Sequence, residues 1–295
     1  MLPGTFTTPL KLALAQTISV VATGATIAPL STSDVALTVD GGATLDIRGI
    51  RLLQLRLISC GSTGGQPSKL SISDGELFAL NNNAPAVEIT RCALSLAAVD
   101  VNMNSNEDFV AINGDATFDG NRLHVHGNTT VYMFAFGTDS SMEITNSLLE
   151  DVGLAINTTD SSGPGSEFTF AEDTFIKTAD FSLQQGCEQA SSAFRRVRYE
   201  NSVIAPLGAF DAVTGTSCTF NNTFLSHQTI PPAGTLVGDP EFVDPTMRDY
   251  HLKATSAAID AAVPSLYGLD ASVDLDGTSR PQGAMPDLGA YERVP

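Results

Sequence analysis

Apolar and polar residues alternate over short stretches along the whole chain, and the spacing of an amphipathic helix is nowhere sustained for three turns. The segment from Leu10 to Ile27 shows the pattern well, because its leucine, isoleucine and valine residues alternate with smaller or more polar ones. It superficially resembles a signal peptide, but Gln16 and Thr17 interrupt its interior and no basic stretch precedes it. We predict strands in this segment and expect any export signal to lie upstream of Met1.

A second pattern recurs at long range and predicts a solenoid. It consists of an apolar residue, four positions of mixed character and another apolar residue, with a mean step of about 25 residues. Repeats of this length typically stack so that each unit buries its apolar face only against its neighbours. The step from Ile72 to Ile89 is short for a full coil. The copies are Ile47 to Leu52, Ile72 to Leu77, Ile89 to Leu94, Phe118 to Leu123, Ile144 to Leu149, Phe170 to Phe175, Tyr199 to Ile204 and Phe220 to Leu225.

An asparagine recurs at one place in the later copies. It is Asn146 after Ile144-Thr145, Asn201 after Tyr199-Glu200, and Asn222 after Phe220-Asn221. Asparagine tolerates the left-handed backbone and bonds its own turn, so we predict a tight bend at each of these positions. The apolar residue before the bend then points inward from one strand, and the apolar pair after it begins the next.

These motifs resemble those of known families. The Ile-x-Asn-Ser-x-Leu-x-x-x-Gly pattern that starts at Ile144 resembles the parallel β-helix repeat of the pectin-lyase-like superfamily, and Pro3-Gly4-Thr5-Phe6 resembles an early turn of such proteins. The C-terminal part resembles the terminal region of bacterial surface β-helix proteins of the choice-of-anchor Q type. The motifs of that part are Gly238-Asp239-Pro240-Glu241-Phe242, Asp249-Tyr250-His251-Leu252, Ser256-Ala257-Ala258-Ile259-Asp260, Asp274-Leu275-Asp276-Gly277-Thr278-Ser279-Arg280-Pro281 and Pro286-Asp287-Leu288-Gly289-Ala290-Tyr291-Glu292.

Repeat and resemblance together predict an all-β protein. We expect a right-handed parallel β-helix of about eight to ten coils over residues 1–235, and a C-terminal cap over residues 236–295 that folds across the open end. The resemblance also implies a bacterial protein that is secreted or exposed on the cell surface.

Composition and charge limit the kinds of partner that this protein can bind. Charged residues make up only 16% of the chain, and 15 Lys and Arg stand against 33 Asp and Glu, for a net charge of −18. Such a surface repels nucleic acid and anionic membranes, because both depend on cationic contacts. No stretch is long and apolar enough to insert into a membrane. Phosphate loops, dinucleotide fingerprints and serine-hydrolase elbows are absent from the sequence as well. Neutral glycans, metal ions and other proteins remain as partners.

The four cysteines show no zinc-binding spacing. Cys187 and Cys218 lie about one coil apart, so they are either cross-linked neighbours or buried free thiols. Cys60 and Cys92 fall at different phases of the repeat, and we predict that they are unpaired.

The resemblance implies two kinds of chemistry. Lyases of this fold hold calcium on acidic residues and abstract a proton with Lys or Arg, whereas hydrolases use clustered Asp residues as acid and base. If the chain is an enzyme, the basic candidates are Lys177, Arg196 and Arg198, and the acidic ones are Asp151 and Asp173. The alternative is that these charges form a solvated face without catalytic function.

Two further groups are candidates for ligand or metal binding. Asp100 and Asn102 alternate with apolar residues and should face solvent, and His124 and His126 share one side of a strand at a spacing that can hold a metal. The sequence shows no third ligand, so surface histidines are the simpler interpretation. Asp274 and Asp276 resemble part of a calcium loop but lack its closing Glu, so they bind Ca²⁺ or form turns with Arg280 or backbone amides.

The sequence therefore supports two functional hypotheses. The first is a non-catalytic, exported module that binds a polysaccharide or cell-surface glycan. The second is a polysaccharide lyase, or less readily a hydrolase, with Ca²⁺ as its cofactor. They differ in whether Asp, Lys and Arg converge in one outward groove. A purely structural spacer would have neither a groove nor a ligand.

Overall fold

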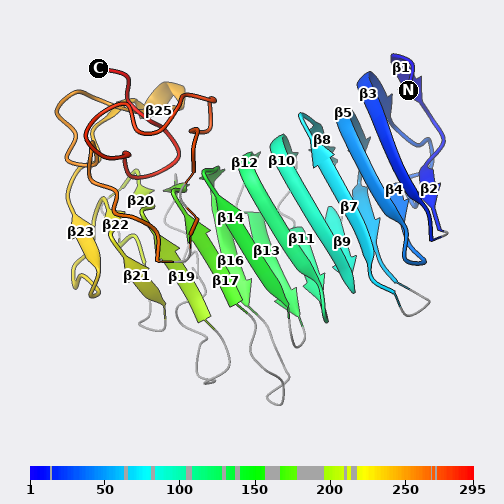
Figure 1. The fold of residues 1–295 in the computed structure, drawn as a ribbon, viewed down its shortest axis with the longest axis horizontal. Coiled ribbons are helices and arrows are strands. Elements are labelled where there is room, and N and C mark those ends of the chain that lie inside the picture. Colours follow the sequence, from blue (N-terminus) through cyan, green and yellow to red (C-terminus); the bar gives the residue numbers. More distant parts are fainter. Residues whose placement is uncertain are drawn as a thin grey trace.

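The computed structural model confirms an all-β parallel solenoid (Figure 1). It describes the chain except at residues 14, 63–65, 81–83, 104–107, 128–130, 137–139, 157–166, 178–195, 209–210, 214–217, 267 and 270. Every strand pair in its two large sheets is parallel, and a small antiparallel pair lies in the C-terminal region. This is the predicted right-handed β-helix, and the described strands of its second sheet alone mark about seven coils.

Over the described residues, the larger sheet has 16 strands and the second has seven. The larger contains β1 (Gly4–Phe6), β3 (Thr17–Ile27), β5 (Thr44–Gln54), β7 (Ser68–Ser73), β8 (Glu76–Ala79), β10 (Cys92–Met103), β12 (Thr117–Gly127), β14 (Ser141–Thr145), β15 (Leu148–Glu150), β17 (Glu167–Ala171), β18 (Thr174–Lys177), β19 (Arg196–Glu200), β20 (Val203–Pro206), β21 (Thr219–Asn221), β22 (Thr223–Leu225) and β23 (Thr235–Val237). The second contains β2 (Leu10–Leu12), β4 (Val35–Val39), β6 (Arg56–Cys60), β9 (Val87–Thr90), β11 (Asp108–Asn113), β13 (Val131–Phe136) and β16 (Val152–Ile156). β24 (Phe242–Asp244), the 3-10 helix η1 (Pro245–Met247) and β25 (Asp249–Leu252) follow.

Each coil bends once within the larger sheet at a residue of left-handed backbone, which we call the corner residue. The predicted bends at Asn146, Asn201 and Asn222 are confirmed, with φ of 57°, 45° and 51°. The other coils use other residue types at the same place. The series is Gly24, Gly49, Asp74, Ala98, Arg122, Asn146, Glu172, Asn201 and Asn222. Because every coil turns at the same point, the strands on either side of the corner stack in register.

The register confirms most of the predicted repeat and corrects two copies. Ile47 pairs with Ile72, and Ile144, Phe170, Tyr199 and Phe220 pair in succession. The copy at Ile89 is wrong, because Ile89 lies in β9 of the second sheet and Leu96 is the true partner of Ile72. The copy at Phe118 is two residues early, because Gly120 occupies the position that pairs with Ile144. A Cβ at Gly120 would lie 2.6 Å from Leu123 Cδ1, so the apolar side chain that the pattern required would force the Leu123 side chain to move.

The interior of the later coils is filled by stacked aromatic rings. The rings of Phe170, Tyr199 and Phe220 stack with centroids 5.2 and 5.5 Å apart, and Phe175 meets Phe170 edge to face. These residues are buried, so the repeat that fixes the backbone register also aligns the core.

The C-terminal region packs along the flank of the solenoid rather than across its end alone. Figure 1 shows it, in orange and red, beside the later coils. Its apolar residues Phe242, Tyr250 and Leu288 form a second core with outward residues of β15, β18, β20 and β22, such as Leu148 and Phe224. The last strand that continues the larger sheet, β23, ends at Val237. The predicted division at residue 235 stays a prediction.

The structure also tests the strands expected near the N-terminus and the expected absence of a membrane-spanning helix. The predicted strands between Leu10 and Ile27 are present as β2 and β3. Within the described residues, the structure has no helix of the length and apolar character needed to cross a membrane.

The prediction for Cys60 and Cys92 was wrong, because the two form a disulfide with Cα atoms 5.8 Å apart. The prediction compared the positions of the two cysteines within the repeat. That comparison failed because the bond joins the end of β6 in one sheet to the start of β10 in the other. Cys218 is also disulfide-bonded, and none of the cysteines that the structure describes is free. Cys187, its predicted partner, lies outside the described residues.

The corner asparagines also hold the C-terminal region. Asn201 is buried, its amide nitrogen donates to the Val263 carbonyl at 2.7 Å, and its amide oxygen accepts from the Val263 N–H at 3.0 Å. We predict that Asn201→Ala lowers the free energy of unfolding by about 2–4 kcal/mol, because it leaves buried backbone groups unpaired and strains a left-handed position. Urea unfolding measures the change. Asn102→Ala, on an outward strand position, is the control and should stay within about 0.5 kcal/mol; equal effects would contradict the role of the corner.

Candidate functional site

Asp100, Asn102, His124 and His126 form a square on the outward face of the larger sheet, which we call the histidine patch. The register pairs Asp100 with His124 and Asn102 with His126 across β10 and β12. The intervening residues Val101 and Val125 are fully buried. The sequence-based expectation that these four residues face outward is therefore correct, and stacking brings them together.

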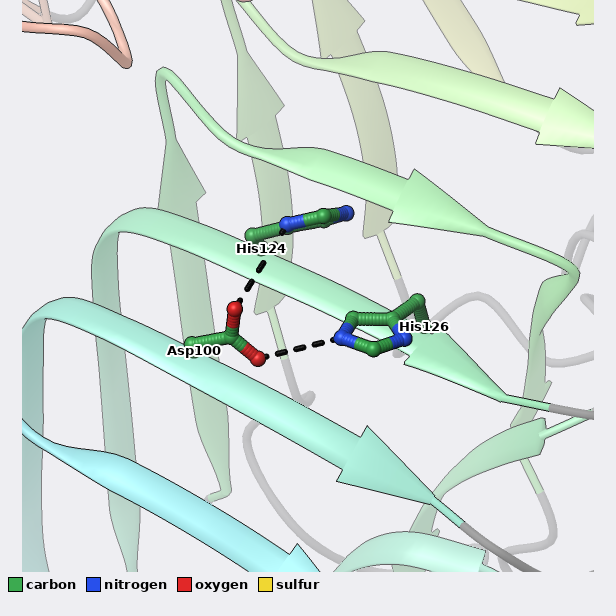
Figure 2. A group of neighbouring side chains, drawn as sticks. All are labelled: Asp100, His124 and His126. Atoms are coloured by element: carbon green, nitrogen blue, oxygen red, sulfur yellow. Dashed lines mark hydrogen bonds and ion pairs between the residues drawn. The ribbon is translucent and has the colours of Figure 1, made fainter. Parts of the chain in front are cut away.

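Asp100 lies between the two imidazoles (Figure 2). Its Oδ1 is 3.1 Å from His126 Nε2, and its Oδ2 is 3.8 Å from His124 Nδ1. The histidine rings are 4.7 Å apart between centroids. The hydrogen bond with His126 is the main cause that lowers the pKa of Asp100. Asp100 lies on the neighbouring coil, so its carboxylate joins the two imidazoles in a group of three residues that the sequence did not reveal.

The patch connects to the C-terminal region through Glu150. The carboxylate of Glu150 is buried, and His124 Nε2 lies 2.9 Å from its Oε2. Its Oε1 accepts a hydrogen bond from the Tyr250 hydroxyl at 2.8 Å and lies 3.3 Å from Arg248 Nε. Burial raises the pKa of Glu150, but the hydrogen bonds of His124 and Tyr250 outweigh it, so the pKa is lowered and the carboxylate is charged. His124 is thus held from its Nε2 side by a buried anion.

A second cluster lies on the same face, on the other side of the corner. A hollow of about 370 Å³ is lined by Asp119, Glu143, Glu167, Thr169 and Arg198, and we call it the acidic groove. Asp119, Glu143, Thr169 and Arg198 occupy equivalent positions on successive coils. Arg198 forms an ion pair with Glu167. Stacked strands lie about 4.8 Å apart, so the groove presents a row of polar groups at that spacing.

Two carboxyl groups of the groove are electrostatically unusual. Partial burial raises the pKa of Asp119, although a hydrogen bond with Ser95 opposes it. Partial burial also raises the pKa of Glu143, and the neighbouring charge of Asp119 adds to the effect. Both groups are therefore short of compensating donors, and a ligand that donates hydrogen bonds would stabilise them.

The predicted catalytic residues whose side chains the structure describes do not converge on one site. Lys177 is buried, and Asp173 is fully buried with its Oδ1 accepting from the Ser147 N–H at 2.7 Å. Asp151 takes a left-handed turn, and its N–H donates to the Ile176 carbonyl. Among the predicted catalytic side chains that the structure describes, that of Arg198 lines the groove. Arg196 lies in β19, and its side chain is outside the described part. The first three belong to turns and core rather than to an outward site.

The three carboxylates of the groove were missed at the sequence level. The signal was present, because Asp119 and Glu143 each follow an inward apolar residue, Phe118 and Met142, at a spacing of one coil. A repeat aligned on Gly120 would have placed them together.

Asp274 and Asp276, for which the sequence left calcium binding and turn formation open, form contacts within the C-terminal region. Asp274 is buried and accepts from the N–H groups of Thr278 and Glu292, as the turn interpretation expects. Asp276 Oδ2 lies 2.9 Å from His251 Nε2. Over the described part of the chain, the His, Cys, Asp and Glu side chains that gather closely enough for a metal are those of Asp100, His124 and His126.

Comparison with known proteins adds little to this geometry. No protein-family model matches the chain, and no curated protein does. The solved structure of pectate lyase Pel9A is similar with 16% identity and a TM-score of 0.47, over 99% of this chain and 86% of that one. At that distance the likeness transfers neither activity nor residue roles.

His251 provides a pH test of the C-terminal region. Burial lowers its pKa, but hydrogen bonds and charges of Asp249 and Asp276 outweigh this, so its pKa is raised. A raised pKa contributes stability below the ordinary value of about 6.5 that is lost as pH rises through the folded-state value. We therefore predict that His251→Gln lowers the melting temperature more at about pH 5.5 than at about pH 8.5. Lys69→Gln, on an exposed strand position, should show no such pH dependence, and a pH-independent effect of His251→Gln would contradict the assignment.

Proposed function

We propose that the chain is an exported or cell-surface β-helix protein that binds a polysaccharide or cell-surface glycan without cleaving it. The observation that carries this proposal is the acidic groove, where outward polar groups converge across successive coils. Carboxylates accept hydrogen bonds from sugar hydroxyls, and hydrogen bonds to charged groups are stronger than neutral ones. The spacing of the coils is comparable with the length of one hexose unit, so a glycan can follow the row.

The charges of the groove favour a neutral glycan. Among the described side chains that line the groove, the three carboxylates of Asp119, Glu143 and Glu167 outnumber the one guanidinium, that of Arg198, which forms an ion pair with Glu167. The net charge of −18 also opposes a polyuronate unless a cation bridges the two. A neutral chain of hydroxyl donors meets neither obstacle.

Export is supported by the cysteines. Disulfides persist outside the reducing cytosol, and Cys60–Cys92 is such a bond. The C-terminal motifs that resemble surface proteins of the choice-of-anchor Q type point the same way.

The second candidate is a polysaccharide-cleaving enzyme. Two carboxyl groups with raised pKa on neighbouring coils, Asp119 and Glu143, are the kind of pair that glycoside hydrolases use as acid and base. Lyase chemistry has less support, because Lys177 is buried and Arg198 is ion-paired. Calcium would be the cofactor if this enzyme were a lyase.

The test is binding to a panel of neutral and uronate-rich polysaccharides, with and without calcium, while reducing ends and unsaturated products are followed. We expect affinity for a neutral polymer without product. The double variant Asp119→Asn/Glu143→Gln should bind it about tenfold more weakly or worse, since one hydrogen bond to a charged group is worth about 1.5–3 kcal/mol.

Asp46→Asn is the matched control for the groove. Asp46 is exposed on the same outward row but lies three coils from Asp119, outside the groove. Its substitution should leave binding unchanged. Product formation would establish the enzyme instead, and absence of binding across the panel would contradict the proposal.

A further inference from the structure

We propose that Asp100, His124 and His126 bind one divalent transition-metal ion, such as Zn²⁺, at the border between the solenoid and the C-terminal region. This inference is independent of glycan binding. It starts from three donor atoms of the histidine patch that all lie within 4.8 Å of one another, one from each residue. The three come from adjacent strands whose register is fixed by the corner residues Ala98 and Arg122.

The separations fit a small ion. Zinc binds histidine nitrogen and carboxylate oxygen at about 2.0–2.2 Å, so two ligand atoms of a tetrahedral site lie about 3.3 Å apart. The distances from the carboxylate of Asp100 to His126 Nε2 and His124 Nδ1 are 3.1 and 3.8 Å. Figure 2 shows the carboxylate turned toward both rings. An ion can therefore sit among the three with modest side-chain rotation.

The contact between His124 and Glu150 is a second, separate observation. His124 Nε2 lies 2.9 Å from Oε2 of Glu150, whose side chain is buried. The other ring nitrogen, Nδ1, faces Oδ2 of Asp100 at 3.8 Å. A carboxylate on the far nitrogen is the usual support of a metal-bound histidine, so the ring already has the orientation that such a site needs.

The donor set selects the type of metal. Two imidazole nitrogens and one carboxylate suit zinc, cobalt, nickel and copper, whereas calcium prefers oxygen ligands alone. The sequence suggested calcium only as the cofactor of the lyase hypothesis, and this donor set does not suit calcium.

The site also leaves room for a further ligand. The side chains of Asp100, His124 and His126 are 51%, 35% and 17% exposed, respectively. A hollow of about 260 Å³ borders Asp100 and His124 and is also lined by Arg122 and Tyr291. Three protein ligands with open positions are typical of sites that hold an exchangeable water or an external group.

The experiment uses the full chain without an affinity tag, freed of metal by chelator and titrated calorimetrically with zinc, and separately with cobalt while visible absorption is recorded. We expect one equivalent of each metal, a cobalt spectrum in the visible range and no binding of calcium. His124→Gln/His126→Gln should abolish the binding, and Asp100→Asn should weaken it. Glu150→Gln should weaken it about 10–100-fold by releasing the ring of His124.

The chain offers a matched control in its two other histidines. His227→Gln/His251→Gln removes the same number of imidazoles outside the patch and should keep one equivalent bound. Circular dichroism checks that the patch variants keep their β structure, which is expected because the replaced side chains face outward. Absence of binding to the unaltered chain would overturn the site. Binding that survives in His124→Gln/His126→Gln but is lost in the control would place the metal elsewhere and overturn it equally.

Discussion

The left-handed residue at each corner is the constraint on which the rest of this molecule depends. A strand that bends at the same position in every coil keeps its inward and outward residues in phase with those above and below it. A shift of one residue in any coil would turn the stacked rings of Phe170, Tyr199 and Phe220 outward. The backbone at Asn146, Asn201 and Asn222 sets this phase, and the same side chains reach across to bond the C-terminal region.

The corner also divides the outward face into two chemical surfaces. Before the corner, Asp119, Glu143 and Arg198 stack into the acidic groove. After it, the same face has a polar part at Asp100 and His124 and an apolar part that begins at Leu148. The C-terminal region covers the apolar part, and the histidine patch lies where that cover ends. Glu150 joins the two, because it holds His124 on one side and Tyr250 on the other.

Much of the fold could be predicted from sequence because stacking repeats leave a periodic trace. Asn201 revealed its bend through residue type, and the alternation around Val101 and Val125 revealed the outward patch. The errors arose where the residue type at a position did not indicate its place in the repeat. Gly120 hid one copy of the repeat, and the bond between Cys60 and Cys92 crosses between sheets, which no phase rule anticipates.

The candidate sites were less accessible because they depend on which coils are neighbours. Asp100 and His124 are 24 residues apart in sequence yet directly paired, so their cooperation appears only once the register is known. Lys177 and Asp173 looked like surface charges in the sequence, but the turns around Ser147 and Ser202 draw Asp173 inward. The charge of a residue alone does not show whether its side chain stabilises a turn or binds a ligand.

The central claim is that coil register assembles the chemistry of the outward face. Crystals of the tag-free chain grown with zinc, measured on both sides of the zinc absorption edge, test it most directly. The account predicts one anomalous peak between Asp100, His124 and His126, which requires β10 and β12 to stack in the stated register. An anomalous peak at another position would contradict this account. So would the absence of a peak together with an electron-density map in which the side chains of Asp100, His124 and His126 lie far apart.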